Sequence, residues 1–297
     1  MTTAQEKEDV NVNEEDFVED IVIDPSIDQS FENHVNDAIR SKVPQFLEMV
    51  KTADLIPTLE KIRCTESMEA LLQRFLKARS GDVNLAFKFL KEDCEWREAN
   101  QILSLRTKSM DDMLVAGRNP ILKETIVSMI PQGCLGRDKQ GRPILYRKVT
   151  GNMNVQKLAE LGYSVEEFLI YQAWMLERTV AMMNDKGQWI SIMDLGELNL
   201  TKMMGNLNIV KAFTALAKNH FPERLAHNII INAPTVFGIV WRAVQVWLDK
   251  ETQKKVSIFS SPKNWKPALE KEMDLNLLPT ESGGPAHLSY SPSSFDP

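Results

Sequence analysis

One stretch, from Phe221 to Val256, limits what this chain can fold into more than any other. It contains the apolar run Ile229-Ile230-Ile231, which is too short for a helix and is rich in β-branched side chains. This pattern is typical of a strand that is covered on both faces. Asn232-Ala233-Pro234 ends the strand, and Thr235 is predicted to cap the helix that follows.

The helix predicted from Val236 to Leu248 is apolar on all of its sides. Its only charged residue is Arg242, and its only other polar side chain is that of Gln245. Such a helix must be fully buried or must face something apolar that is not protein. Two interpretations follow, an ordinary core helix or the wall or lid of a lipid pocket.

Strands and helices alternate from Arg142 to Phe259. Ser164 and Glu167 have the spacing of a capping box, which opens a helix to about residue 184, and Gly205 is a weak point in a helix predicted from 201 to 219. This alternation predicts an α/β fold with a mainly parallel sheet. The expected strands are 142–149, 188–194, 229–231 and 256–259.

An all-helical part is predicted before this region. The segment from Glu66 to Arg79 has apolar residues at helical spacing. Gly81 then stops the helix, and Asp82 is placed to cap a second helix that ends near Asn100. An earlier segment, 31–55, is also expected to form a helix that packs on the body of the protein.

Charge is distributed unevenly along the chain. Residues 1–30 contain ten acidic residues and only Lys7, a local charge of −9, so the remaining residues carry −6 − (−9) = +3. This acidic, aromatic-poor segment is predicted to be a disordered tail. A mildly basic body does not suggest a nucleic-acid partner, but it suits a weak, transient approach to an anionic membrane surface.

The cysteines and the apolar runs restrict where the protein can act. Cys64, Cys94 and Cys134 are widely spaced, which argues against a disulfide framework and against zinc. The acidic N-terminus has no signal-peptide pattern, and no apolar run approaches the roughly 18 residues that span a bilayer. We therefore expect a cytoplasmic protein that associates peripherally with membranes.

No enzyme motif is found in the sequence. The nucleophile elbow and both glycine-rich phosphate-binding motifs are missing. No activating group lies near Cys134 in sequence, and Asp194 is interpreted as a loop anchor or helix cap. The histidines have neither metal-ligand spacing nor a nucleophile partner: His34, His220, His227 and His287. We expect a binding protein rather than an enzyme, with no metal site.

Methionines are frequent in the α/β region. This soft, adaptable side chain suits contact with acyl chains, although it is also an ordinary core filler. The residues concerned are Met175, Met182, Met183, Met193, Met203 and Met204. Together with the apolar helix, they favour a hydrophobic cavity.

Three motifs, in order, resemble the Sec14-like (CRAL-TRIO) family of lipid-binding and phosphatidylinositol-transfer proteins. They are the helical segment 72–79 (LQRFLKAR), the central segments 221–225 (FPERL), 231–234 (INAP) and 248–249 (LD), and the closing Leu278-Pro279 with Gly283-Gly284. The resemblance covers residues 41–289. It implies a hydrophobic cavity beneath a gate helix, with no cofactor other than a bound phospholipid.

The resemblance also implies a domain organisation and a set of cavity residues. The acidic tail is 1–30, the helical subdomain 31–110, the lipid-binding domain 120–290 and the flexible C-terminus 291–297. The residues expected at the cavity and gate are Val236, Phe237, Val240, Val244, Trp247 and Ser191.

A polar lipid head group needs fixed partners, and the sequence offers a pair of them. Thr252 and Lys255 are three positions apart just after the gate helix, which places them on one helical face. The phosphatidylinositol-transfer branch of the family adds Arg79 and Glu223. Arg79 and Lys255 are expected to meet the phosphate, and Thr252 and Glu223 the inositol hydroxyls.

Two departures from that branch affect the ligand. Ser80 follows Arg79 where the branch often has a lysine, which weakens charge compensation. Trp189 takes one of two strand positions where members that also carry phosphatidylcholine have small hydroxyls, and Ser191 takes the other.

The sequence therefore predicts a monomeric protein that takes one phospholipid, phosphatidylinositol, for transfer or for presentation to lipid-modifying enzymes. Two alternatives remain open. The ligand could be a sterol, a tocopherol or a retinoid, or the domain could be a scaffold that does not transfer lipid.

Overall fold

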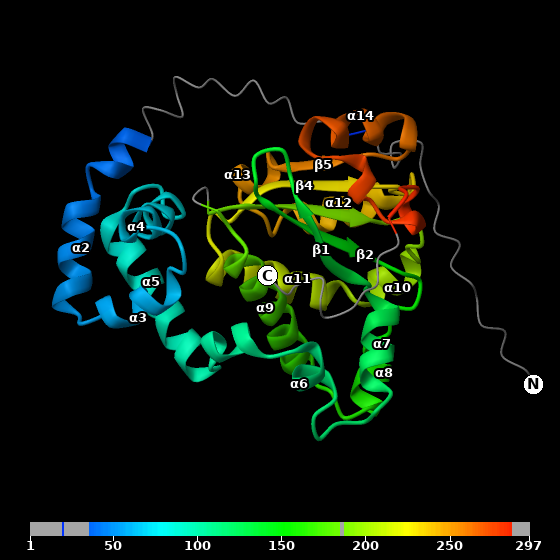
Figure 1. Ribbon diagram of the computed structural model, residues 1–297, viewed down its shortest axis with the longest axis horizontal. Helices are drawn as coiled ribbons and strands as arrows, with labels where there is room; N and C mark the ends of the chain where they lie inside the picture. Colours follow the sequence, from blue (N-terminus) through cyan, green and yellow to red (C-terminus); the bar gives the residue numbers. More distant parts are fainter. Residues whose placement is uncertain (1–19, 21–35, 185–186, 287–297) are drawn as a thin grey trace, which may run out of the picture.

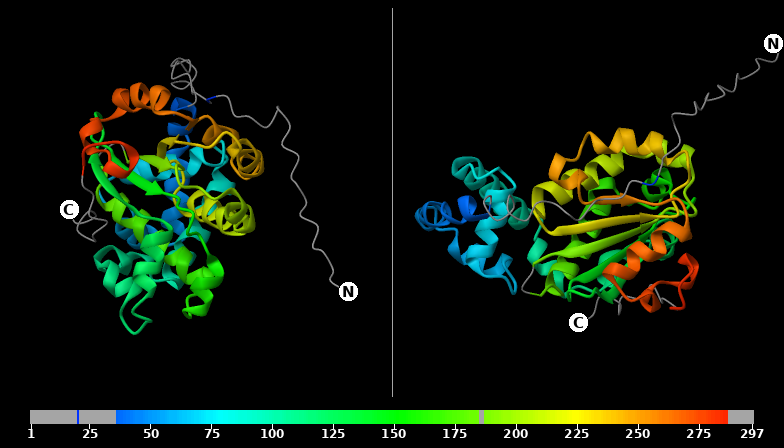
Figure 2. Two further views of the ribbon diagram at one scale, coloured as in Figure 1. Left: turned by 90° about the vertical axis from the view of Figure 1, so that its right-hand side faces the viewer. Right: turned by 90° about the horizontal axis from the view of Figure 1, so that it is seen from above.

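The computed structural model describes residue 20 and residues 36–184 and 187–286. A helical unit lies beside one end of an α/β unit, as the two views in Figures 1 and 2 show. The predictions for the tail 1–30, apart from Asp20, and for the C-terminus 291–297 lie outside the described residues. No helix in the described ranges is both long enough and apolar enough to span a bilayer.

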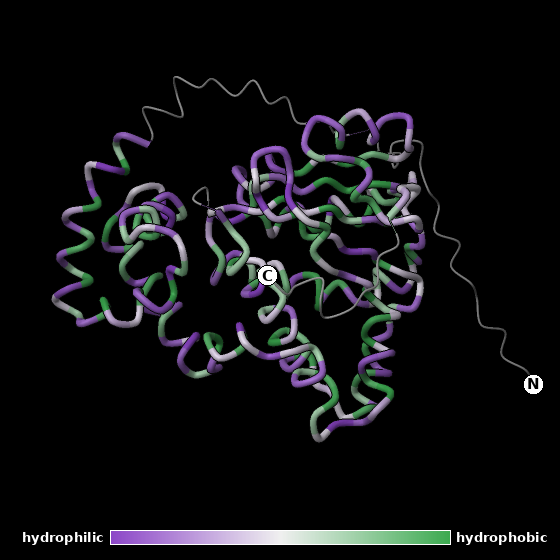
Figure 3. The backbone as a smooth tube through the Cα atoms, in the orientation of Figure 1, coloured by the Kyte–Doolittle hydropathy of each residue, from purple (hydrophilic) through white to green (hydrophobic). Residues whose placement is uncertain are grey.

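The helical unit has its own hydrophobic core. Its helices are α2 (Val43–Thr52), α3 (Ile56–Ile62), α4 (Met68–Lys77) and α5 (Val83–Ala99). Fifteen buried residues from Ile39 to Cys94 form this core, and the alternating hydropathy of α2 in Figure 3 reflects its one buried side. The predicted stop and cap are confirmed, since Gly81 has φ +75° and the Asp82 side chain accepts a hydrogen bond from Leu85 N at 2.9 Å.

The α/β unit is built on a five-stranded sheet in the order β1-β2-β3-β4-β5. The strands are β1 (Gln132–Arg137), β2 (Pro143–Lys148), β3 (Trp189–Asp194), β4 (Leu225–Ile231) and β5 (Val256–Ile258). β1 pairs with β2 in antiparallel fashion, and the other three pairings are parallel. The predicted α/β class with a mainly parallel sheet is therefore confirmed.

Helices cover both faces of this sheet. On one face, α14 (Pro262–Glu272) packs through Trp265 and Leu269 on alternate residues of β2, β3 and β4. The opposite face meets α9 (Val165–Ala181), α10 (Leu200–Gly205), α11 (Leu207–His220) and α12 (Phe237–Gln245). The remaining elements are η2 (Ile102–Thr107), α6 (Met110–Leu114), α7 (Leu122–Met129), α8 (Val155–Glu160), α13 (Lys250–Gln253), η3 (Leu275–Leu277) and η4 (Thr280–Ser282).

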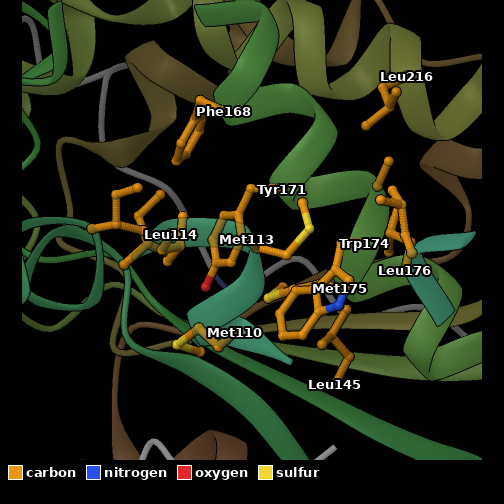
Figure 4. Packing of buried hydrophobic residues seen from close by; sticks show 14 of the residues in the cluster. Met110, Met113, Leu114, Leu145, Phe168, Tyr171, Trp174, Met175, Leu176 and Leu216 are labelled. Atoms are coloured by element: carbon orange, nitrogen blue, oxygen red, sulfur yellow. The ribbon is translucent and has the colours of Figure 1, made fainter. Parts of the chain in front are cut away.

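The long helix α9 organises the largest core. Its capping box is confirmed, because Ser164 Oγ accepts from Glu167 N at 3.1 Å and the Glu167 carboxylate accepts from Ser164 N at 2.9 Å. In Figure 4 the α9 side chains Tyr171, Trp174 and Met175 pack with methionines of α6 and with Leu145 of β2. Of the six predicted methionines, Met175, Met183 and Met203 are buried, whereas Met204 is 41% exposed.

The structure corrects two predictions in the region of the gate. Thr235 does not cap the helix: it is an exposed turn residue, and α12 begins at Phe237 without any side-chain cap. The helix also ends earlier than expected, at Gln245. The weak point at Gly205 is confirmed, since the helix predicted from 201 to 219 divides there into α10 and α11.

Candidate functional site

A group of polar residues lies where the helical unit meets the α/β unit. Lys255 Nζ lies 3.1 Å from Glu223 Oε2, and Lys77 Nζ lies 3.8 Å from the same oxygen. The structure thus brings together two of the predicted residues, Glu223 and Lys255, and adds Lys77, which the sequence analysis did not single out. We call Lys77, Arg79, Glu223, Thr252 and Lys255 the junction cluster.

The Pro-Glu-Arg segment directs successive side chains to different places. Glu223 has a φ of +58°, in the left-handed region that few non-glycine residues adopt. This turn leaves the Glu223 side chain 17% exposed in the junction cluster, while the next residue, Arg224, is 4% exposed. The motif therefore provides one carboxylate for the site and one buried arginine for the scaffold.

Arg79 lies at the turn after α4 and stacks on an aromatic ring. Its guanidinium carbon lies 3.5 Å from the centroid of Phe89, and one of its nitrogens donates to Ala78 O at 2.8 Å. Partial burial lowers the pKa of Arg79. The charges of Glu92 and Asp249 raise it, but by less than burial lowers it. Among the described residues, no carboxylate comes within ion-pair distance of this guanidinium, so its charge is available to a ligand.

Thr252 and Lys255 are connected through the short helix α13. Asp249 caps this helix and accepts from both Thr252 N at 2.8 Å and Thr252 Oγ1 at 3.0 Å. Burial raises the pKa of Asp249, but these two hydrogen bonds and the charge of Lys218 outweigh it, so the net pKa is lowered. Lys255 lies beyond the end of α13, and its N–H donates to Thr252 O at 3.0 Å, which keeps a helix-like spacing between the two residues.

The charges at this junction do not balance. Three cations of the cluster, Lys77, Arg79 and Lys255, accompany one carboxylate, Glu223. Two further carboxylates act on Arg79: Glu92, which pairs with Lys88 at 3.8 Å, and Asp249, which is itself close to Lys218. An excess of positive charge on partly exposed side chains suits a negatively charged group such as a phosphate.

The sheet presents two rows of side chains to α9, α11 and α12. The register pairs Leu145 with Ser191, Ser191 with Asn228 and Asn228 with Val256 in one row. The next row contains Gln132, Arg147, Met193, Ile230 and Ile258. Ser191 and Met193 lie on the central strand and yet remain partly exposed, so the covering helices do not close this face completely.

The predicted gate helix covers this face with only part of its surface. Phe237 and Val240 are buried, and they pack with Met203 of α10 and with Ile230 and Ile258 of the sheet. Val244 packs on the same cluster while remaining partly exposed, and Val236 and Trp247 flank the helix in its two turns.

The turn after the gate helix exposes apolar side chains on the protein surface. Val246, in the turn that follows α12, is 72% exposed. Trp241 and Trp247 are both partly exposed. The helix therefore packs on the sheet, whereas the turn after it is apolar and accessible.

Trp189 occupies one of the two strand positions at which the family resemblance implied a small hydroxyl. It is 5% exposed, belongs to the main core and meets the Phe221 ring edge-on, with the ring centroids 6.3 Å apart. Space that a small residue would leave at this position is therefore occupied by protein.

The Asn-Ala-Pro turn is locked by polar contacts that the sequence analysis did not predict. Asn232 has φ +54°, donates to Asp194 Oδ1 at 3.0 Å and accepts from Trp265 Nε1 at 2.9 Å. Asp194 also accepts from Gly196 N at 2.9 Å and from the Ser282 hydroxyl. Asp194 is therefore a loop anchor, one of the two roles expected for it. It joins three segments at the carboxyl ends of the parallel strands.

Buried ion pairs fasten the helical unit to the α/β unit. Glu66 accepts from Arg74 and from Arg224, each at 2.6 Å. Arg97, from α5, bonds Asp93 at 2.9 Å and Glu177 of α9 at 2.6 Å. These contacts fix α4 and α5, and hence Lys77 and Arg79, relative to the segment that carries Glu223.

The surroundings of His220 and Cys134 suit a structural role rather than a reactive one. His220 stacks on Trp96, with centroids 3.6 Å apart, and its Nδ1 lies 2.8 Å from Asp93. Burial raises the pKa of the Cys134 thiol, which keeps the thiol protonated and unreactive. In the ranges that the structure covers, no group of three or more His, Cys, Asp or Glu residues is arranged to hold a metal ion.

The comparisons with known proteins agree with this architecture. A family model described as the CRAL/TRIO domain matches residues 128–284. Sec14 cytosolic factor from Schizosaccharomyces pombe is 27% identical over 235 residues, which cover 76% of this chain and 78% of that protein. The protein called real-time from Aedes aegypti is 28% identical over 225 residues, which cover 72% of this chain but only 33% of that longer protein.

A solved structure has a similar fold. The crystal structure of Sfh5 superposes with a TM-score of 0.53 and 18% sequence identity, covering 79% of this chain and 82% of that one.

Proposed function

Since this chain belongs to the CRAL/TRIO family of Sec14-like lipid-binding proteins, we propose that it takes one phospholipid, phosphatidylinositol, into its interior. It transfers the lipid between membranes or presents it to lipid-modifying enzymes. In this proposal it acts as a monomer in the cytoplasm, touches the membrane surface only transiently and makes or breaks no covalent bond. Residues 31–110 serve as the helical subdomain and residues 120–290 as the lipid-binding domain.

The observation that carries the proposal is the junction cluster with its excess of positive charge. Lys255 is held 3.1 Å from Glu223 and is 23% exposed, so it is oriented but still accessible. A phosphodiester can accept hydrogen bonds from Lys255 and Arg79, while Glu223 and Thr252 can bond the hydroxyls of an inositol ring. A ligand without a phosphate would leave Arg79, which has no carboxylate within ion-pair distance among the described residues, without an anionic partner.

The acyl chains of the lipid need an apolar path, and the sheet face under α12 offers one. Met193, Ile230 and Ile258 line this face, with Ser191 as a small polar residue among them. Phe237, Val240 and Val244 form the side of the gate helix that would lie over the chains. The exposed apolar surface around Val246 then meets the bilayer when the gate opens.

Substitution of Lys255 tests the head-group assignment. We expect Lys255→Ala to lower phosphatidylinositol transfer between vesicles by about tenfold or more, because a hydrogen bond to a charged group contributes roughly 1.5–3 kcal/mol. Thr252→Asp should have a similar effect through repulsion of the phosphate. Lys254→Ala is the matched control, since Lys254 is an exposed neighbour paired with Glu251 at 2.8 Å. Equal transfer by the Lys255 and Lys254 variants would remove the junction cluster from the site.

Lipid analysis of the purified protein tests the identity of the ligand. Mass spectrometry should find phosphatidylinositol at about one molecule per chain. A stoichiometric sterol, tocopherol or retinoid would replace phosphatidylinositol as the ligand, and an empty protein that does not load lipid from vesicles would indicate a scaffold.

A further inference from the structure

One of the buried cations, Arg147, lies far along the chain from the residues of the junction cluster and forms no ion pair with any described residue. Arg147, on β2, is 8% exposed and faces the same side of the sheet as Met193 and Ile230. Burial lowers its pKa to about 10, and among the described residues no carboxylate compensates its charge. At neutral pH it therefore remains a buried, positively charged group.

The partners of this guanidinium are neutral. Its Nε donates to Gln132 Oε1 at 3.0 Å, and a terminal nitrogen donates to Gln172 Oε1 at 3.3 Å. The ring of Phe213, from α11, lies over it with the guanidinium carbon 4.5 Å from the centroid. Neutral acceptors and an aromatic face reduce the cost of burying a charge but do not neutralise it.

The two glutamines supply a second and independent indication of an anion site. Gln132 and Gln172 are 3% and 2% exposed, and the buried Nε2 atom of each has no partner that meets hydrogen-bond geometry, although the Tyr171 hydroxyl lies within reach of Gln132. Both amides face the guanidinium with their oxygen atoms, so their unpaired N–H groups belong to the same cluster. Buried donors normally find partners, and two orphaned donors beside an uncompensated cation match the needs of an anion.

The cluster borders the face of the sheet that the covering helices leave incompletely closed. Met193 is paired with Arg147 in the sheet register and remains partly exposed, as does Phe213 on the opposite side. A hydrocarbon chain lying along Met193 and Ile230 would therefore end next to the guanidinium.

We propose that Arg147, Gln132 and Gln172 form an interior site for the oxyanion of an amphiphile, a carboxylate or a phosphate, whose hydrocarbon lies along the Met193 and Ile230 face. The oxyanion would accept two hydrogen bonds from the guanidinium and others from the two amides, which is the geometry that arginine prefers. This site is separate from the junction cluster and does not require the ligand there to be phosphatidylinositol. It would allow the protein to carry a free fatty acid or a lysophospholipid.

Calorimetric titration of the full-length protein with matched pairs of amphiphiles tests the proposal. Oleate is compared with oleyl alcohol, and oleoyl-lysophosphatidic acid with monooleoylglycerol, all below their critical micelle concentrations. We expect the wild-type protein to bind at least one anionic member about tenfold or more tightly than its neutral counterpart. A preference only for oleate assigns the site to carboxylates, and one only for the lysophosphatidic acid assigns it to phosphates.

Substitutions test whether Arg147 and the glutamines cause the preference for the anionic amphiphile. Arg147→Met keeps the approximate volume and removes the charge, so both members of each pair should bind equally. Arg137→Met is the matched control, because Arg137 lies on the neighbouring strand but is exposed, and it should keep the preference. If Arg147→Met fails to fold, Gln172→Leu should still weaken the preference several-fold. Wild-type protein without any preference, or variants at Arg147 and Gln172 that retain it in full, would overturn the proposal.

Discussion

Gly284, in the closing motif, occupies a position that only glycine fits. A Cβ atom there would lie 2.0 Å from the carbonyl oxygen of Leu278 and 2.5 Å from its carbonyl carbon. The close approach exists because the chain folds back on itself: Gly284 N donates to Pro279 O at 2.9 Å, and Ala286 N donates to Leu278 O at 3.1 Å. The Leu-Pro and Gly-Gly parts of the motif are therefore the two sides of one contact.

Replacing this glycine should destabilise the protein. We expect Gly284→Ala to lower the free energy of unfolding by about 1–3 kcal/mol or more, since the backbone of Leu278 cannot yield as a flexible side chain would. Gly205→Ala is the control, because nothing lies within 4 Å of its added Cβ and it should gain up to about 1 kcal/mol. Chemical denaturation measures both values, and a Gly284→Ala variant as stable as the wild type would contradict the close contact.

Individual residues also show which roles can be inferred from the sequence and which depend on tertiary contacts. Asp194 could be interpreted as a loop anchor because it follows a predicted strand, and it has that role. Lys77 could not be linked to Glu223, because 146 positions (223 − 77) separate them. On α4 alone, Lys77 looks like an ordinary surface charge. Arg147 was overlooked because a charged residue in an amphipathic strand is normally solvated, and only the packing of α9 and α11 buries it.

Among the elements, α12 and the turn after it combine two surfaces with different roles. Val240 is 1% exposed and packs on the sheet, whereas Val246 is 72% exposed. The apolar pattern of the sequence allowed either a core helix or a lid, and the helix has features of both. Its inner side belongs to the core, and its outer end remains apolar and accessible.

Aspartate substitutions should separate these two surfaces. Val240→Asp would bury an unpaired charge and should cost several kcal/mol of stability. Val246→Asp should leave the free energy of unfolding within about 0.5 kcal/mol of the wild type, as is usual for exposed positions. It should nevertheless weaken binding to vesicles, because the charge replaces apolar surface that we propose contacts the bilayer.

Vesicle sedimentation and hydrogen exchange provide the measurements. A gate helix should lose amide protection when vesicles are present, because opening breaks its packing. Sedimentation of Val246→Asp at the wild-type level, together with unchanged protection of α12, would place the membrane contact elsewhere.

Element positions followed from the sequence wherever periodicity was strong. The strands β2 to β5 and the helix α9 lie within a few residues of their predicted bounds, because their β-branched runs and capping box act locally. β1 was not predicted, since Gly133 and Gly136 interrupt its pattern and its pairing with β2 is a tertiary effect. The early end of α12 was missed for a related reason: its apolar pattern continues through Val246 and Trp247, which form a turn instead.

For the whole molecule, stability depends on buried charges that join its two units. Glu66 is 4% exposed and lies between Arg74 and Arg224, which come from different units. Burial raises the pKa of Glu66, but the charges and hydrogen bonds of these arginines outweigh burial and hold it below its usual value. None of this was visible in the sequence, because Glu66 and Arg224 lie 158 positions apart (224 − 66).

A lowered carboxylate pKa has a defined effect on stability. The contribution of Glu66 is fully present above its unfolded pKa of about 4.3 and is lost as the pH falls through its lower folded value. We expect Glu66→Gln to lose about 3–5 kcal/mol of stability at pH 7, because it leaves the buried Arg224 and the partly buried Arg74 without their carboxylate. The difference between variant and wild type should narrow below pH 4.

Denaturation at pH 7, 5, 4 and 3 measures this dependence. Glu60→Gln is the control, since Glu60 forms a partly exposed pair with Arg63 at 2.6 Å and should change stability by at most about 1 kcal/mol. A constant difference between Glu66→Gln and the wild type at all four pH values would show that the charge of Glu66 is not the source of its effect.

The same ion pairs determine an order of events during synthesis on the ribosome. The helical unit ends at Ala99 and has a core of its own, but two partners of its charged residues, Glu177 of α9 and Arg224 just before β4, are translated later. Arg224 follows Ala99 by 125 positions (224 − 99), which corresponds to roughly 6–25 s at usual translation rates. During this interval Glu66 can pair only with Arg74, and Arg97 only with Asp93, so the two units can join fully only after Arg224 has left the exit tunnel.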